Sequence, residues 1–367
     1  MNTIQTMGRT RLIIAGVLFV LIIGIAIGAL RGNHTSATTA AGCHPAQAAT
    51  SPAQHSTFTE YPMPHAQSDL MSPAMDAQGN IWVGEMGGNR IGRLNPTAHT
   101  ITEWAPPHGE NGIMGIVTDR QGNVWFAEEA ANYIGRFDPA ACHFTTYSLP
   151  QRNGAVAAPD GVALAADGTV WYTQFGNNEI GSLNPQTGAI TTYPLPIPDK
   201  NTPPLPYGIT VDHQGAIWFT ELGAGAIGKL DPATGKISAI PLSNVSAQPN
   251  TIITAPDGKL WFTEMNTGVL GMIDPTTGNL VEHPAPAAYG TVAQLYDVAS
   301  GASGALWMTS SGANALLRYD PAGDVWSKTD LPEPDSAPYG LAVGRDGTVW
   351  FTEAAPAANR IGVYQGA

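Results

Sequence analysis

The run Ile217-Trp218-Phe219-Thr220-Glu221 occurs, in closely related forms, seven times along this 367-residue chain. Successive tryptophans of these copies are separated by 43 to 47 residues, and seven of the nine tryptophans occupy this position. The seven are Trp82, Trp125, Trp171, Trp218, Trp261, Trp307 and Trp350. A period of this length, built from strand-like units, is typical of a β-propeller with one four-stranded blade per repeat.

The fourth repeat shows the four expected strands of a blade most clearly. Short runs rich in β-branched and aromatic residues cover 207–212, 217–221, 227–230 and 236–240, and turns rich in Gly, Pro and Asp separate them. The tryptophan run is almost continuously apolar, which is typical of a strand buried on both faces. We therefore predict an all-β, seven-bladed β-propeller over residues 58–367, with each tryptophan packed between neighbouring blades.

The two ends of the propeller sequence complement each other. The seventh repeat stops at 361–364, after its third strand, whereas 58–64 (Phe-Thr-Glu-Tyr-Pro-Met-Pro) is similar to the fourth strand of the third repeat at 190–196. We predict that the N-terminal strand completes the last blade and closes the ring, which protects the edges of the sheets.

The N-terminal region differs from the rest of the chain. An apolar run of 19 residues, 12–30, follows two arginines and is long enough to cross a bilayer. We expect 1–31 to be a signal anchor that leaves the propeller outside the cytoplasm, because the arginines stay inside. Cleavage, which would give a secreted protein, is the alternative, since 36–42 offers small residues. Residues 32–57 are rich in Ala, Thr, Ser, Gln and His and are expected to form a flexible stalk.

Charge and cysteine content restrict the partners. All 29 acidic residues lie beyond Arg31, together with 13 of the 16 basic ones. Such an acidic domain is a poor partner for nucleic acid, and we expect none. The only two cysteines are Cys43 and Cys142. They could pair in an oxidising compartment, but the sequence leaves open whether they do.

Two positions of each repeat are candidates for chemistry, because propellers bind ligands at one end of the central channel. The first is the residue that ends the tryptophan strand, and it is a glutamate in five blades. Around the ring it reads Glu85, Glu128, Gln174, Glu221, Glu264, Ser310 and Glu353. Such carboxylates suit a hard cation, Mg²⁺ or Ca²⁺. The alternative is that each glutamate binds backbone amides of nearby loops.

The second position comes eleven residues before each tryptophan and varies between blades. It reads Met71, Met114, Asp160, Tyr207, Asn250, Tyr296 and Tyr339. We expect the three tyrosines to form an aromatic wall, with Asp160 and Asn250 supplying polar contacts, at a channel mouth that binds a small-molecule or peptide ligand. The alternative is that these side chains line the channel without binding a ligand.

The recurrent Pro-x-Gly-Ile, Asp-Gly-x-Ile-Trp-Phe-Thr-Glu, Asn-x-Ile-Gly-x-Leu-Asp-Pro and Tyr-Pro-Leu-Pro patterns over 58–364 resemble the streptogramin lyase (virginiamycin B lyase) family. The resemblance implies a magnesium-assisted elimination that linearises a cyclic depsipeptide. It also implies a general-base histidine in the Pro-x-Gly position, a metal-binding glutamate that ends a Trp-Phe-Thr-Glu strand, and a second histidine three residues later. Only the glutamate carries over, at Glu221, Glu264 and Glu353, because both histidine positions hold other residues in every blade.

Two histidines remain near the expected mouth. His65 and His108 each lie six residues before a variable-position residue, in equivalent loops of neighbouring blades. They are the remaining candidates for a catalytic base, which must lie within reach of the substrate; the alternative is that both are solvated. We therefore expect a membrane-anchored, extracytoplasmic propeller that binds a ligand at its channel mouth. An active Mg²⁺-dependent lyase with a relocated base and a protein-interaction platform are the alternatives.

Overall fold

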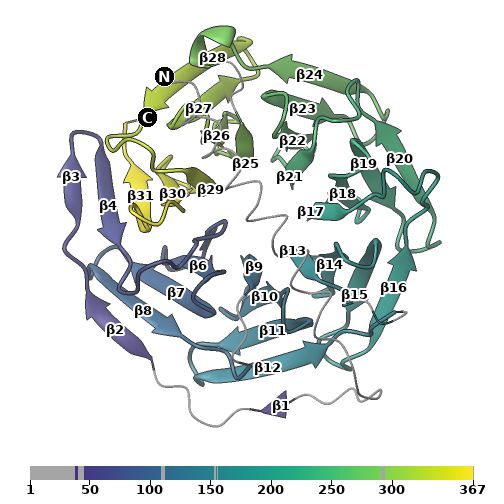
Figure 1. Ribbon diagram of the computed structural model, residues 1–367, viewed down its shortest axis with the longest axis horizontal. Coiled ribbons are helices and arrows are strands. Elements are labelled where there is room, and N and C mark those ends of the chain that lie inside the picture. The colour runs from purple at the N-terminus through teal and green to yellow at the C-terminus, as the bar shows by residue number, and fades with distance from the viewer. Residues whose placement is uncertain are drawn as a thin grey trace, which may run out of the picture.

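The structure, a computed structural model, describes residues 38–39, 45–108, 112–152, 154, 156–290 and 294–366. In these residues seven antiparallel sheets stand around a common axis, like the blades of a propeller (Figure 1). This confirms the predicted all-β, seven-bladed β-propeller. The expected membrane segment, 1–31, lies outside the described residues; within them, no helix has the length and apolarity needed to cross a membrane.

Blades three to six are four-stranded sheets, and their strands follow one another from the axis outward. Blade three consists of β13 (Pro159–Leu164), β14 (Val170–Gln174), β15 (Glu179–Leu183) and β16 (Ile190–Pro194). Blade four consists of β17 (Pro206–Val211), β18 (Ile217–Glu221), β19 (Ala226–Leu230) and β20 (Ile237–Pro241). Blade five consists of β21 (Pro249–Thr254), β22 (Leu260–Glu264), β23 (Val269–Ile273) and β24 (Leu280–Pro284), followed by the 3₁₀ helix η1 (Ala287–Tyr289). Blade six consists of β25 (Leu295–Ser300), β26 (Leu306–Ser310), β27 (Ala315–Asp320) and β28 (Val325–Asp330).

The other three blades each have a fifth strand on the outer edge, supplied by the N-terminal region. Blade one consists of β5 (Ala74–Met75), β6 (Ile81–Glu85), β7 (Arg90–Asn95) and β8 (Thr100–Trp104), with β2 (Ala46–Ala49) outside. Blade two consists of β9 (Ile113–Thr118), β10 (Val124–Glu128), β11 (Tyr133–Asp138) and β12 (His143–Ser148), with β1 (Thr38–Thr39) outside. Blade seven consists of β29 (Pro338–Val343), β30 (Val349–Glu353), β31 (Arg360–Tyr364), β4 (Phe58–Pro62) and β3 (Ala53–His55).

The ring closes through β4, as predicted. This strand pairs with β31 in antiparallel register, from Phe58 opposite Tyr364 to Pro62 opposite Arg360. The Phe58 ring lies 5.1 Å from the Tyr364 ring and 6.0 Å from the Phe351 ring, measured between centroids. The last blade therefore combines strands from both ends of the chain, and the closing strand contributes to its core.

Three short strands from the region expected to be a flexible stalk, 32–57, pair with the propeller: 38–39, 46–49 and 53–55. The strands β3, β2 and β1 lie on the outer edges of blades seven, one and two in turn (Figure 1). Cys142, just before β12, is disulfide-bonded. Cys43, the other cysteine of the chain, lies outside the described residues.

The repeated tryptophans pack between blades, as predicted. Trp218 is 2% exposed and contacts a cluster that includes Ile252 and Phe262 of blade five. Its indole nitrogen donates a hydrogen bond of 2.8 Å to the Asp212 carboxylate, at the turn before its own strand. The same bond recurs in blades one and two. The aspartate therefore satisfies the only polar atom of this buried side chain.

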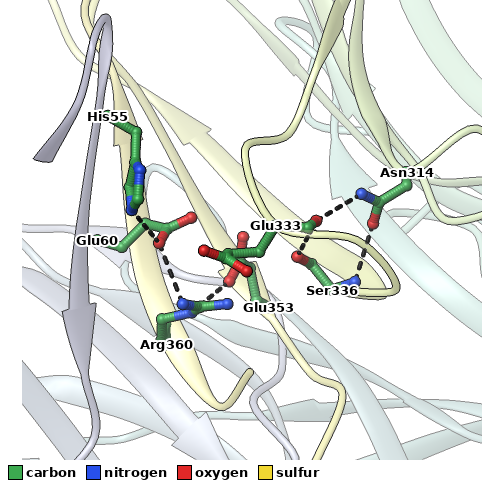
Figure 2. Close-up of polar contacts among 7 residues, drawn as sticks. All are labelled: His55, Glu60, Asn314, Glu333, Ser336, Glu353 and Arg360. Atoms are coloured by element: carbon green, nitrogen blue, oxygen red, sulfur yellow. Dashed lines mark hydrogen bonds and ion pairs between the residues drawn. The ribbon is translucent and has the colours of Figure 1, made fainter. Parts of the chain in front are cut away.

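Asparagines in the left-handed backbone conformation tie several blades to the next one. Asn314, at the turn between β26 and β27, has a φ of 47°. Its amide donates a hydrogen bond to the Glu333 carbonyl and accepts one from the Ser336 backbone nitrogen, both in the loop that leads into blade seven (Figure 2). Asparagine tolerates this conformation better than other non-glycine residues. These contacts fix the loops that lead to the channel.

Candidate functional site

The innermost strands present the variable position to the axis. Threonines of the tryptophan strands hold the backbone at that position in the next blade: the Thr220 hydroxyl donates to the Asn250 carbonyl at 2.7 Å. The glycine that follows the variable residue allows close approach, since a Cβ on Gly208 would lie 2.4 Å from the Asn250 carbonyl oxygen. Neighbouring first strands therefore pack closely, and the variable side chains are confined to the channel.

All seven variable residues line one cavity of about 130 Å³. They are Met71, Met114, Asp160, Tyr207, Asn250, Tyr296 and Tyr339. Apolar residues two positions further along the same strands also line it, including Ile116, Val162, Ile209 and Ile252. The expected set thus lies together around a single cavity, polar and aromatic in one layer and aliphatic in the next.

Two tyrosines meet across this cavity. The Tyr207 and Tyr339 hydroxyls, from blades four and seven, lie 2.6 Å apart and share a hydrogen bond. The Tyr296 ring lies 5.2 Å from the Tyr339 ring. Burial raises the pKa of both bonded tyrosines, and the nearby Asp160 carboxyl raises it further. Both hydroxyls are therefore neutral hydrogen-bonding groups at physiological pH.

An acidic pair lies beside the tyrosines. Asp160 is 7% exposed, and burial, followed by the nearby Glu129 carboxyl, raises its pKa well above the usual range. Glu129 follows the end of β10, and burial raises its pKa to about 7. Glu129 was not among the site residues expected from the sequence. Its position directly after a strand-end glutamate, in the loop that leaves a second strand, was the signal that could have identified it.

Asp297 is a second residue that the sequence analysis missed. It replaces the glycine of the Pro-x-Gly pattern in blade six, lines the cavity and is buried. One carboxylate oxygen accepts a hydrogen bond from the Val298 backbone nitrogen at 2.8 Å, and the other accepts one from the Leu341 backbone nitrogen at 2.9 Å. Its departure from the repeated glycine could have identified it. Both oxygens are satisfied by backbone, so this carboxylate links blades six and seven.

The seven residues that end the tryptophan strands, which were expected to face the channel as a possible metal site, do not line the channel cavity. All seven are buried. Burial is the main cause that raises the pKa to about 7 for Glu85, Glu221, Glu264 and Glu353. None of these four glutamates contributes a carboxylate to the lining of the channel cavity.

Blade seven shows how such a glutamate is accommodated. The Glu353 carboxylate accepts a hydrogen bond of 2.7 Å from the Arg360 Nε, and the same guanidinium lies 3.1 Å from the Glu60 carboxylate (Figure 2). His55 of β3 lies 3.7 Å from Glu60 on the other side. One arginine thus bridges two buried carboxyl groups, one of which belongs to the closing strand β4.

The described residues do not fit the magnesium site that the resemblance implies. Among them, no group of three or more His, Cys, Asp or Glu side chains is arranged to hold a metal ion. Glu221, Glu264 and Glu353 belong to three different blades, and Glu264 instead accepts a hydrogen bond from the Thr267 hydroxyl. We derive no chemical step through a metal from these residues.

The two candidate histidines also lie away from the cavity lining. The His65 Nδ1 contacts the buried Glu103 carboxylate of β8. The His108 ring lies 5.0 Å from the Tyr133 ring, and its Nε2 is 3.4 Å from the Thr146 hydroxyl of β12. Each histidine therefore binds to the outer strand of its own blade, which is the role of a structural contact between a loop and a sheet.

Comparison with known proteins agrees with this architecture. The model of the virginiamycin B lyase family matches residues 43–290. A streptogramin B lyase structure is 29% identical with a TM-score of 0.75, covering 83% of this chain and 96% of its own. The virginiamycin B lyase of Staphylococcus aureus is 27% identical with a TM-score of 0.75, covering 84% of this chain and 99% of its own. A catalytically inactive variant of the S. aureus enzyme with quinupristin matches at 28% identity, with a TM-score of 0.75, covering 84% of this chain and 99% of that one. The search of curated protein sequences found no match. The chain belongs to the virginiamycin B lyase family.

Proposed function

We propose that this family member is an extracytoplasmic binding protein whose channel cavity holds one group of a small-molecule or peptide ligand without breaking a bond in it. The observation that carries the proposal is the convergence of seven first strands on one cavity. Their variable side chains include three tyrosines, a buried aspartate and a buried asparagine. The positions that build the blades keep the same residue type around the ring, whereas this position changes, as selective binding requires.

The size of the cavity restricts what can enter it. Pockets that enclose a drug-sized ligand have volumes of about 300–1,000 Å³. The channel cavity has about 130 Å³. It therefore accepts a single side chain or head group, and the remainder of a larger ligand would lie outside the cavity, on the loops at the channel mouth.

The absence of the implied histidines supports binding without elimination. The variable position holds no histidine in any blade. His65 and His108 contact outer strands and do not line the cavity. Proton abstraction requires a base within hydrogen-bonding reach of the substrate. A magnesium ion remains a proposal from the resemblance alone.

One observation favours a second function, an active magnesium-dependent carbon–oxygen lyase with a relocated base. Glu129 lies near Asp160, whose side chain lines the cavity, and burial raises the pKa of Glu129 to about 7. A carboxylate with such a pKa is a competent general base near neutral pH. Together with membership of the lyase family, this makes Glu129 the residue to test if the protein opens a ring.

We also propose that residues 1–31 anchor the protein and that the propeller lies outside the cytoplasm. The apolar run 12–30 and the preceding arginines support the anchor. The disulfide bond of Cys142 supports export, because such bonds persist in oxidising compartments.

The experiment that tests the function uses quinupristin, because a similar structure holds this ligand. Binding to the full propeller is measured by calorimetry, with and without Mg²⁺. Elimination opens a ring without changing the mass, so the product must be resolved by chromatographic retention and fragmentation. We expect binding and an intact ring under both conditions.

Two variants complete the test. We expect the double variant Tyr207→Ala/Tyr339→Ala to lose quinupristin binding and to keep a cooperative unfolding transition. The control Tyr193→Ala, on the outer strand β16, should bind like the unmodified protein. A linearised product would establish the lyase function instead. Absence of binding, or binding that the double variant retains, would contradict the proposed site.

A further inference from the structure

The channel cavity holds one buried acceptor without a donor and, beside it, a carboxyl group that receives no hydrogen bond from the described residues. The Asn250 side chain is 4% exposed, and its Oδ1 has no hydrogen-bond partner among the described residues. No described residue donates a hydrogen bond to the Asp160 carboxyl group. Buried polar atoms are nearly always hydrogen-bonded, and those that are not call for a specific explanation. Both acceptors line the same cavity.

Asp297 provides the contrast within the same wall. Its two oxygens accept hydrogen bonds from two backbone nitrogens, at 2.8 and 2.9 Å. That carboxylate is satisfied by the fold. Asp160, at the variable position of blade three, has no such donors, so its side chain is available to a ligand.

The charges around Asp160 have one sign. The Glu129 carboxyl raises the pKa of Asp160, and the Asp160 carboxyl in turn raises the pKa of Tyr207 and Tyr339. The Asp297 carboxyl also raises the pKa of Tyr339. No lysine or arginine lines the cavity. Burying an ionised carboxylate without a partner is costly, so the ligand group that complements this cavity is a cation that donates hydrogen bonds.

The lining favours an organic cation over a metal ion. Mg²⁺ and Ca²⁺ require about six to eight oxygen ligands, and the described residues offer no group of three or more acidic or histidine ligands. Tyr296 and Tyr339 instead present aromatic rings 5.2 Å apart, beside Met71 and Met114. Aromatic faces attract ammonium groups, and thioethers pack well against their alkyl carbons.

We propose that the channel cavity binds a protonated amine, which donates hydrogen bonds to the Asp160 carboxylate and the Asn250 Oδ1 and packs against the Tyr296 and Tyr339 rings. This rests on the proposed function, since it names the chemical class of the group that the cavity takes. The cavity volume of about 130 Å³ fits a small alkylammonium head group.

Binding of an ammonium group has a consequence for protons. Burial and the nearby Glu129 raise the pKa of the Asp160 carboxyl well above its usual range, and burial raises the pKa of Glu129 to about 7. A bound cation favours the ionised form of both. Amine uptake therefore releases protons, and the affinity rises as the pH rises through about 7.

The experiment compares n-butylammonium with n-butanol, which has nearly the same size and no charge. Calorimetric titration of the full propeller in two buffers of different ionisation enthalpy measures the affinity and the protons released. We expect binding of n-butylammonium only, with proton release. Asp160→Asn should weaken binding by about tenfold or more, the loss of one charge-assisted hydrogen bond. The control Asp330→Asn, on the outer strand β28, should bind normally.

The outcomes separate this inference from the proposed function. If n-butanol binds as well as n-butylammonium, or if Asp160→Asn binds the amine unchanged while its melting temperature matches the parent, the amine inference is wrong. The same holds if quinupristin binds and n-butylammonium neither binds nor competes with it. Binding of Mg²⁺ alone, abolished by Asp160→Asn, would replace the amine with a metal. If neither quinupristin nor either butyl probe binds, the proposed function fails as well.

Discussion

The substitution Glu221→Gln isolates the energetic effect of one buried carboxyl group. Glu221 ends β18, is 6% exposed, and has a pKa raised by burial from 4.5 to about 7. The chain itself shows that an amide fits this position, because blade three has the fully buried Gln174 there. The variant therefore removes the charge and keeps the shape.

The sign of the effect follows from the protons that each state binds. Between pH 4.5 and 7 the folded protein binds more protons at Glu221 than the unfolded chain does, so the free energy of unfolding falls as the pH rises. The stability that the protonated Glu221 contributes to the folded state is complete below pH 4.5 and is lost as the pH rises through 7. A shift of this size corresponds to about 3 kcal/mol at pH 8.

The assay is urea unfolding followed by tryptophan fluorescence between pH 4 and 8.5. We expect Glu221→Gln to match the parent at pH 4 and to be more stable by up to about 3 kcal/mol at pH 8. The exposed Asp330, which pairs with Lys328 at 2.7 Å, is the control, and Asp330→Asn should change stability by less than about 1 kcal/mol at every pH. A stability difference between Glu221→Gln and the parent that is constant across this pH range would refute the reasoning.

Three further predictions concern ring closure, the buried charge bridge and export. Phe58→Ala should lower the free energy of unfolding by about 3–5 kcal/mol, since it removes a buried ring from the closing strand; an unchanged urea midpoint would contradict closure by β4. Arg360→Ala leaves Glu60 and Glu353 buried without their bridging cation and should cost about 3–5 kcal/mol at pH 8. At pH 5 the loss should shrink, because Glu353 has a pKa of about 7 and becomes protonated; a loss independent of pH would oppose this assignment. A reporter active only outside the cytoplasm, fused after residue 57, should be active, and activity of a cytoplasm-only reporter there would reject export.

Much of the fold could be predicted from the sequence because each blade repeats the same local rules. The tryptophan run predicted a doubly covered strand, and Trp218 indeed packs between blades four and five. The unmatched fourth strand predicted closure by β4. The outer strands β1 to β3 could not be predicted, because they add to edges through backbone hydrogen bonds and their side chains carry no strong pattern.

The site was predictable in part for the same reason. The variable position occurs at the same point of every repeat but holds different residue types, which is expected where side chains line a channel and do not pack between blades. All seven of its residues line the channel cavity. The sequence could not show that Tyr207 and Tyr339 meet, because their hydroxyl contact depends on the channel radius. Nor could it show which way Glu221 or Glu353 points, because a strand-end side chain can face the channel or its own blade. Glu129 and Asp297 were missed because each occurs in only one blade.

Closure by β4 makes the order of synthesis a folding problem. The Ser68 backbone and the Asn359 side chain, which meet at this junction, are 291 residues apart in the chain. At the usual rate of about 5–20 residues per second, the ribosome needs about 15–60 s to make that interval. During this time the edge of β4 that pairs with β31 has no partner strand, whereas β3 on the other edge has already been made, and an unpaired edge promotes association with other chains. The first strand of the ring to be made can join its blade only when the last one has been completed.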